Sequence, residues 1–308
     1  MLKKLFGIFF FITLSFAQTS GASSDKVSIE SLYNKELLKR YKEISPLKDL
    51  AKKEKKTYMI SALLALVVFI LFTKYFKLLG FFVSLLMIAS GAYVLYNSSK
   101  NIVDYQTHFK RDIISKISKE CCGFEFLSSR GFSKETLRQS KIFAPDIDQF
   151  NSIDIYKSDR VKFGFIVATF KTKESASVER FNKNRFEGFL IVIDSKSSSE
   201  GVAVSNTLKS KVANMDIVFN SFFSDAKRSE QRGEWSIYGD ISKEDFDKID
   251  SFGNKDIAIS FLNDKIYIAI YHQGNPLEVD VMDEFSLKRA KEYQDIFLEI
   301  KSLVKPFI

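Results

Sequence analysis

Three apolar stretches without charged residues stand out in the chain, at residues 5–17, 57–73 and 78–96. The last two are 17 and 19 residues long, which is enough for a helix to cross the hydrocarbon core of a bilayer. Only the sequence KYFK separates them, so the pattern predicts a transmembrane helical hairpin over residues 57–96. The alternative is that both stretches are buried helices of a soluble core.

The first apolar stretch has the profile of a signal peptide. Lys3 and Lys4 precede it, and small residues stand at Ser15 and Ala17 near its end. A helix of this length rises about 20 Å, which is less than the thickness of the hydrocarbon core. We therefore predict a signal-like segment at residues 1–24, with an uncleaved anchor as the alternative.

Residues 25–56 are expected to form a basic, amphipathic helical segment. Apolar side chains recur every three or four residues from Ile29 to Ile44, which marks one apolar face. Pro46 is expected to interrupt this helix, and a second short helix then leads into the membrane. The apolar face suits either a lipid or oligomer contact or packing on the chain's own downstream domain. The candidates for binding lipid headgroups are Lys52, Lys53, Lys55 and Lys56.

Residues 97–122 are predicted to form an amphipathic helix that continues the second span as a stalk and ends at Gly123. The remaining residues, 123–308, mix strand and helix patterns. Helices are expected after the capping residues Ser133 and Ser242 and over residues 284–304.

Strands are expected where apolar residues alternate with polar ones or form short runs. The strongest are residues 160–173, the segment RFEGFLIVID at 185–194, and a hairpin over 256–271 with an Asn-Asp turn. Shorter candidates are residues 152–156, 202–204 and 234–238. The predicted fold class is therefore α+β: a two-helix transmembrane hairpin followed by a soluble domain with a mainly antiparallel sheet and flanking helices.

The net charge of +8 is unevenly distributed. Residues 1–100 carry 15 Lys and Arg against 6 Asp and Glu, whereas residues 101–308 carry 31 against 32. A nucleic-acid-binding domain concentrates its basic excess on the folded module, so we expect no nucleic acid partner and assign the excess to membrane topology. The flanking lysines place the large domain in the cytoplasm, on the inner membrane. A functional signal at residues 1–17 predicts the reverse, a periplasmic domain.

Motifs for chemistry are sparse. The chain has no GxGxxG, no phosphate-binding loop and no GxSxG. Its two histidines, His108 and His272, are far apart in sequence, and the vicinal Cys121 and Cys122 lack partners for a metal or redox site. We therefore predict no catalytic, cofactor-binding or metal-binding residues, and no cofactor.

Acidic residues gather around one predicted helix. They are Asp240, Glu244, Asp245, Asp247 and Asp250. Their spacing suits a solvated face near a helix N-terminus. The alternative is that they form a carboxylate site of a hydrolase or transferase.

Several segments, in order, resemble a known family. A two-span hairpin and a helix ending near IISKIS are followed by RFEGFLIVIDSK, MDIVFNSFFSD and ISFLNDKIYIAI. Together, over residues 26–275, they resemble the bacterial membrane proteins grouped as domain of unknown function 3137. The resemblance implies an α+β domain that is anchored to the membrane, with most of the protein in the cytoplasm. It also implies a LemA-type membrane protein as a partner. It carries no catalytic residue.

These observations favour a non-enzymatic membrane protein whose α+β domain mediates protein interaction at the inner-membrane surface. Its expected partners are the lipid bilayer and a membrane or envelope protein. Two alternatives stay open at this point. One is the envelope-associated hydrolase or transferase, and the other is a sensory domain that binds lipid or a small ligand in an apolar pocket lined by the Phe-rich strands.

Overall fold

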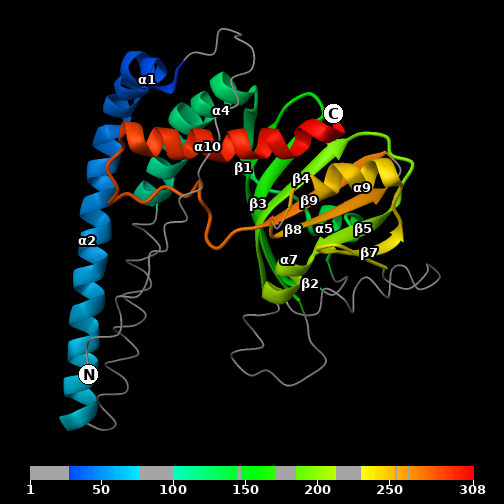
Figure 1. Cartoon of the computed structure of the whole chain (residues 1–308). Coiled ribbons are helices and arrows are strands. Elements are labelled where there is room, and N and C mark those ends of the chain that lie inside the picture. Colours follow the sequence, from blue (N-terminus) through cyan, green and yellow to red (C-terminus); the bar gives the residue numbers. More distant parts are fainter. Residues whose placement is uncertain are drawn as a thin grey trace.

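The computed structural model describes residues 28–75, 100–143, 147–170, 185–212, 230–253, 255–262 and 264–308. Within them, nine strands form one antiparallel sheet with the order β1-β2-β3-β4-β9-β8-β5-β7-β6. Helices lie against this sheet, and the long helix α2 stands to one side of it (Figure 1). The predicted α+β class, with an antiparallel sheet and flanking helices, is confirmed.

The predicted strands at residues 160–173, 185–194, 202–204 and 234–238 correspond to β3, β4, β5 and β7, whereas β1 and β6 were not predicted. The pairing of Leu262 with Lys265 confirms the late hairpin. Strand β2 is much longer than the weak alternation at residues 152–156 suggested. The bounds are β1 Glu125–Arg130, β2 Ile147–Lys157, β3 Val161–Phe170, β4 Arg185–Asp194, β5 Glu200–Ser205, β6 Glu230–Arg232, β7 Trp235–Asp240, β8 Ile257–Leu262 and β9 Lys265–Tyr271.

Short helices begin where the sequence placed capping residues. The Ser133 hydroxyl accepts the backbone N–H of Thr136 at 3.1 Å, and Ser242 caps its helix in the same way. Gly123 ends the helix before it with a φ of 75°, which only glycine adopts without strain. The bounds are α5 Lys134–Gln139, α7 Asn206–Lys211, α9 Lys243–Asp250, α10 Leu287–Val304 and the final 3-10 turn Lys305–Phe307.

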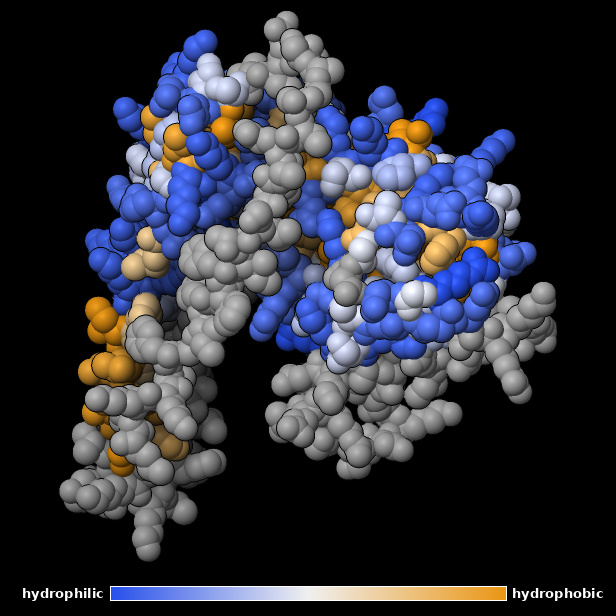
Figure 2. Space-filling model, viewed as in Figure 1, coloured by the Kyte–Doolittle hydropathy of each residue, from blue (hydrophilic) through white to orange (hydrophobic). Residues whose placement is uncertain are grey.

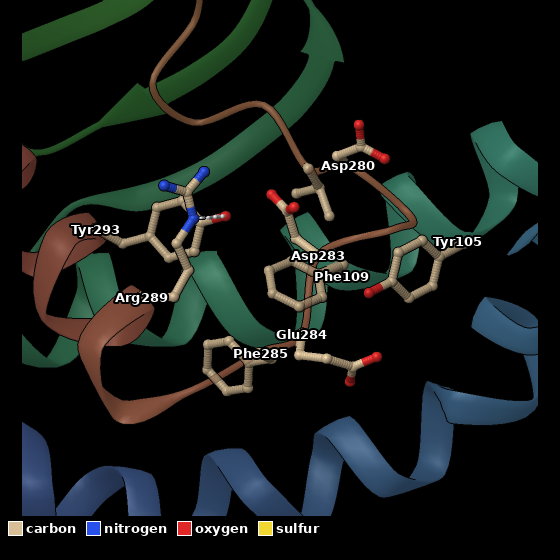
Figure 3. Close-up of a pocket in the computed structure, with 9 residues that line it drawn as sticks. Tyr105, Phe109, Asp280, Asp283, Glu284, Phe285, Arg289 and Tyr293 are labelled. Carbon is tan, nitrogen blue, oxygen red and sulfur yellow. Dashed lines mark hydrogen bonds between the residues drawn. The ribbon is translucent and has the colours of Figure 1, made fainter. Parts of the chain in front are cut away.

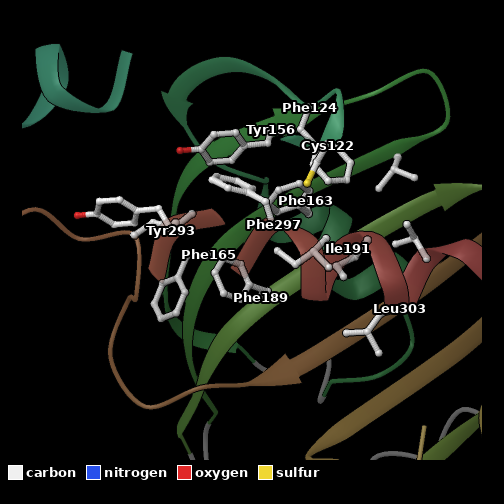
Figure 4. Close-up of a cluster of buried hydrophobic side chains, with 14 of the residues drawn as sticks. Cys122, Phe124, Tyr156, Phe163, Phe165, Phe189, Ile191, Tyr293, Phe297 and Leu303 are labelled. Carbon is white, nitrogen blue, oxygen red and sulfur yellow. The ribbon is translucent and has the colours of Figure 1, made fainter. Parts of the chain in front are cut away.

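Both faces of the sheet are covered. On one face, Phe189 and Ile191 of β4 pack with Phe297 of α10 in a large apolar cluster (Figure 4). On the other face, Leu190 of β4 packs in a second cluster with Leu137 of α5. Burial on both faces explains why β4 is an almost continuous apolar run.

The N-terminal helix is longer than expected. Segment α1 Ile29–Leu32, a π-helical turn Tyr33–Leu37 and α2 Leu38–Tyr75 follow one another without a break. The predicted interruption at Pro46 is wrong, because α2 continues through it. Proline removes one backbone N–H from the helical ladder, but the buried side chains of Ile44 and Lys48 hold the helix against the rest of the protein on both sides of Pro46.

The segment predicted as a stalk packs against the rest of the protein. Helical residues 100–109 continue through the π-helical turn Lys110–Ile114 into α4 Ser115–Cys122. Phe109 and Ile117 are buried, and the ring of Phe109 lies 6.3 Å from that of Tyr293 on α10. Its apolar face is therefore part of the larger core cluster.

Within the described residues, no helix is long and apolar enough to cross a membrane. The predicted signal-like segment, the predicted second span at 78–96 and the segment MDIVFNSFFSD of the family resemblance lie outside the described residues. Of the predicted first span, the backbone is described to its end, and the side chains only as far as Ile70, with residue 68 left out.

Candidate functional site

The basic end of the amphipathic segment meets an acidic loop. This loop, residues 277–286, is the later part of the connection from β9 to α10 and is called the strap here. Leu277, Val279, Val281 and Phe285 anchor it, since each is less than a tenth exposed. Burial of a side chain of this kind contributes about 1.5–3 kcal/mol, so the apolar anchors and not its ion pairs hold the strap in place.

The strap is joined to α2 by ion pairs. Lys55 Nζ contacts both carboxylate oxygens of Asp280, at 2.6 and 2.8 Å. The Glu284 carboxylate forms ion pairs with Lys48 at 2.9 Å and with Lys52 at 3.6 Å. Two of the four lysines that the sequence offered for lipid headgroups, Lys52 and Lys55, therefore already have carboxylate partners within the chain.

These contacts shift the pKa values of the groups that they join. Burial disfavours the charge of Lys48, but its hydrogen bonds to Tyr41 and Glu284 outweigh burial and raise the pKa of the ammonium group. The hydrogen bond from Lys55, followed by the backbone N–H of Met282, lowers the pKa of Asp280. Both groups are therefore held in their charged forms at neutral pH.

The other two predicted lysines, Lys53 and Lys56, are exposed to solvent. Lys100, at the start of the next described helix, is exposed as well. The amide of Asn101 donates a hydrogen bond to Glu54, so the two helices lie side by side at this point. The structure thus brings Lys100 to the same level as Lys53 and Lys56, which spacing along the chain does not reveal.

A small hollow lies between the strap and the helices that carry Tyr105 and Arg289 (Figure 3). Its volume is about 10 Å³, room for roughly one water molecule. Arg289 Nε donates to the hydroxyl of Tyr293 at 3.2 Å, and burial raises the pKa of the Tyr105 phenol. Its lining residues are Tyr105, Phe109, Val279, Asp280, Asp283, Glu284, Phe285, Arg289 and Tyr293. This hollow is too small for a metabolite, and no strand lines it.

Asp245 is the buried member of the acidic group that the sequence singled out. Its carboxylate accepts the hydroxyls of Ser199 at 2.6 Å, Ser197 at 2.8 Å and Ser242 at 3.2 Å, and it pairs with Lys248 at 3.2 Å. Burial raises its pKa, but the serine and lysine contacts prevail and lower it. The residue ties the loop before β5 to the start of α9.

The other four acidic residues of that group, Asp240, Glu244, Asp247 and Asp250, are exposed. Glu244 shares the ammonium group of Lys248 with Asp245, at 3.0 and 3.2 Å, and the Asp245 carboxylate is already occupied by the contacts above. The arrangement therefore corresponds to helix capping and a solvated face.

A buried ion pair was not predicted from the sequence. Lys110, in the π-helical turn, contacts Asp154 at 2.5 Å. Asp154 lies in a bulge of β2 with a φ of 58° and is almost fully buried. Burial raises the pKa of its carboxyl group, and Lys110 opposes that shift. The pair joins the helix at 100–122 to the sheet. Only the charge of the two residues signals it, because they are 44 positions apart.

The remaining candidates for chemistry do not converge. Cys121 and Cys122 are buried and form no disulfide within the described residues. His108 lies 3.4 Å from Asp112. His272 is exposed, and its ring forms a hydrogen bond with the carbonyl of Gly274 at 2.8 Å. Among the described residues, no group of His, Cys, Asp and Glu is placed to hold a metal ion.

Comparisons with known proteins yield no relative. No protein-family model matches the chain, and neither curated proteins nor solved structures contain a match. The family resemblance given in the sequence analysis therefore stays a prediction.

Proposed function

We propose that this protein is a membrane-anchored, non-enzymatic docking protein. Residues 57–96 form its anchor in the bacterial inner membrane, and its α+β domain binds another protein at the membrane surface. The chain's own helices fix the position of that domain relative to the bilayer.

The exposed apolar side chains of α2 carry the proposal. From residue 59 to residue 70, large apolar side chains on more than half of the helix circumference are 44–68% exposed. Figure 2 shows them as an orange region on the lower part of α2. They are Met59, Ile60, Leu63, Leu64, Leu66, Val67, Phe69 and Ile70. A surface helix of a soluble protein has a narrower apolar stripe turned inward. An apolar surface of this width and exposure suits a lipid environment.

The connection between anchor and domain supports a positioning role. Upstream of residue 57, the same helix is part of the core, with Leu37 and Ala51 fully buried. The helix that follows the predicted second span enters the same core cluster. The domain is thus held by both ends of the predicted hairpin, as a domain that must meet a membrane partner requires.

The polar groups of the domain favour docking over catalysis. The Asp245 carboxylate is occupied by structural contacts, and the hollow beside the strap has room for about one water molecule. The charge of residues 101–308 is close to zero, which suits a protein partner better than nucleic acid. A LemA-type membrane protein is the partner that the sequence resemblance suggests.

Extraction of membranes tests the anchor. Membranes from cells that produce the full chain are washed with carbonate at high pH, and the protein is followed in pellet and supernatant. We expect it in the pellet, together with a known integral protein. Release into the supernatant would overturn the proposal.

A reporter fusion tests which side of the membrane the domain occupies. Alkaline phosphatase and a fluorescent protein are fused in turn after Ile308. A fluorescent fusion without phosphatase activity supports the cytoplasmic side. An active phosphatase fusion moves the domain to the periplasm and contradicts the placement that the lysines predict.

A further inference from the structure

We infer that Lys53, Lys56 and Lys100 form a binding surface for anionic phospholipid headgroups. This inference rests on the proposed membrane anchor and adds to it a class of lipid and a set of residues. It differs from the expectation based on sequence, which assigned this role to Lys52, Lys53, Lys55 and Lys56.

The first argument is the position of these lysines along the helix. Lys56 is three residues, or about 4.5 Å, from Met59, where the exposed apolar surface begins. Lys53 lies one turn further from it. A lysine side chain can lay its methylene groups along apolar surface while its ammonium group reaches the headgroup layer. Both residues therefore stand where headgroups of a bilayer around residues 57–70 would be.

The second argument is that the structure brings Lys100 to this level. The hydrogen bond from Asn101 to Glu54 fixes the start of the second helix beside the last polar turn of α2. Lys100, next to Asn101, is exposed. Three exposed lysines from two helices thus lie within about one helical turn of each other, beside the predicted anchor.

The third argument is that some lysines of this region have carboxylate partners within the chain and others do not. Lys55 forms an ion pair with Asp280 of the strap at 2.6 Å, and Lys52 forms one with Glu284 at 3.6 Å. For Lys53, Lys56 and Lys100, the described residues supply no carboxylate within ion-pair distance. Their charge is left for an anion outside the chain, and at this height the abundant anions are phospholipid headgroups.

The expected strength follows from general values. A lysine near an anionic membrane surface contributes about 1 kcal/mol, which is about fivefold in affinity for each residue. Three lysines together give a preference for anionic over zwitterionic lipid of about 100-fold. High salt should weaken this preference, because exposed charges are screened.

Acetylation in nanodiscs tests the inference with single-residue resolution. The full chain is reconstituted in phosphatidylcholine nanodiscs, with or without phosphatidylglycerol, and is treated briefly with an acetylating reagent. Mass spectrometry then gives the rate at each lysine. The internal controls are Lys35, Lys39 and Lys42, which are exposed on the same continuous helix at least 16 Å from Lys53, beyond the range of the surface potential.

At a surface potential of about −30 to −50 mV the fraction of unprotonated amine falls about three- to sevenfold. We therefore expect phosphatidylglycerol to slow acetylation of Lys53, Lys56 and Lys100 by this factor, without an effect on the controls. Equal rates in both lipids would overturn the inference and leave the anchor intact. Protection of Lys52 and Lys55 alone would also overturn it. A chain that does not enter nanodiscs would contradict the anchor itself.

A pair of triple variants supplies the second measurement. K53Q/K56Q/K100Q and K35Q/K39Q/K42Q remove the same charge from exposed positions, and all three positions of the second variant lie on the N-terminal helix. Native mass spectrometry counts the phosphatidylglycerol molecules retained on each. The first variant is expected to lose its preference for this lipid by about 100-fold, and the second to keep it. Equal retention by both variants would contradict the inference.

Discussion

The N-terminal helix has two parts with opposite surroundings. Its packed half, residues 29–56, buries apolar side chains such as Leu37 and Ala51 in the core and pairs three of its lysines with the strap. Its apolar half, residues 57–70, exposes large side chains such as Leu64 and Val67. The packed half is charged yet buried on one face, whereas the apolar half is uncharged yet exposed.

The difference shows that the apolar half is not part of the domain's own core. Leucine occurs in both halves, so composition alone does not decide where a leucine is buried. What decides is whether sheet, strap and α10 lie beside it. Changes in the packed half should therefore affect the stability of the domain, and changes in the apolar half should affect membrane association.

The largest effect is expected from charge in the apolar half. The double variant L64K/V67K places two lysines near the centre of the predicted span, at a cost of about 6 kcal/mol for insertion. The protein should move from the membrane pellet to the supernatant after carbonate extraction. The matched control is L50K, because Leu50 is 51% exposed in the packed half. If L64K/V67K stays in the pellet like the control, the two halves do not differ as described.

The second effect concerns the ion pair between Lys110 and Asp154. K110M leaves the buried carboxylate without its partner and should lower the free energy of unfolding by about 3–5 kcal/mol at pH 7.5. Burial raises the pKa of Asp154, so the carboxyl group takes up a proton as the pH falls and no longer needs the lysine. The loss should therefore shrink at pH 5.

Denaturant unfolding, followed by fluorescence of the single, buried Trp235, measures this. K119M is the control, since the pair of Lys119 with Glu125 is exposed on both sides and should contribute little. A loss in K110M that does not depend on pH would argue against the role assigned to the Asp154 charge.

A matched pair of leucines sharpens the comparison directly. L37A removes a fully buried side chain from the packed half and should cost about 2–5 kcal/mol in the free energy of unfolding. L64A makes the same chemical change in the apolar half, where the side chain is 61% exposed, and should leave the unfolding of the domain unchanged. Both are measured by denaturant unfolding in the same mild detergent. Equal losses would show that the apolar half packs on the domain.

The smallest effect is expected at Asp245, away from the helix. D245N should cost about 1–3 kcal/mol, because the charged acceptor of three hydroxyls and Lys248 is lost. The folded pKa of Asp245 is lowered, so its contribution is present above the ordinary aspartate pKa and is lost as the pH falls through the folded value.

Thermal unfolding between pH 3 and pH 7 should therefore show a difference from the parent protein that vanishes at the acidic end. D247N, at an exposed position of the same helix, is the control. Membrane association should not change in either variant. A D245N protein as stable as the parent at pH 7 would contradict the structural role and reopen the hypothesis of a carboxylate site.

Local features of the fold were predictable from the sequence. Ser133 and Ser242 begin helices because their hydroxyls accept backbone N–H groups within the next turn, and Gly123 ends one because it tolerates positive φ. The strand at residues 185–194 and the hairpin at 256–271 follow from short apolar runs and turn chemistry. In each case the responsible residues are close together in the chain.

Features that depend on distant contacts were not predictable. From the sequence, Pro46 predicts a break in the helix. The helix continues because other segments of the chain bury the side chains around Pro46. The contact of Lys55 with Asp280 joins residues 225 positions apart. Nothing near Lys55 distinguishes it from Lys53 or Lys56, so the sequence could not separate the lysines that the strap takes from those left exposed. The bulge that turns Asp154 inward has no local signal either.

The unbroken passage of α2 through Pro46 has a mechanical consequence. A helix without a hinge behaves as a lever, so a rocking of the proposed anchor in a bilayer would exert a torque on the core cluster that contains Leu37 and Ala51. Changes in bilayer thickness, which tilt helices of fixed length, would in this way reorient the whole α+β domain.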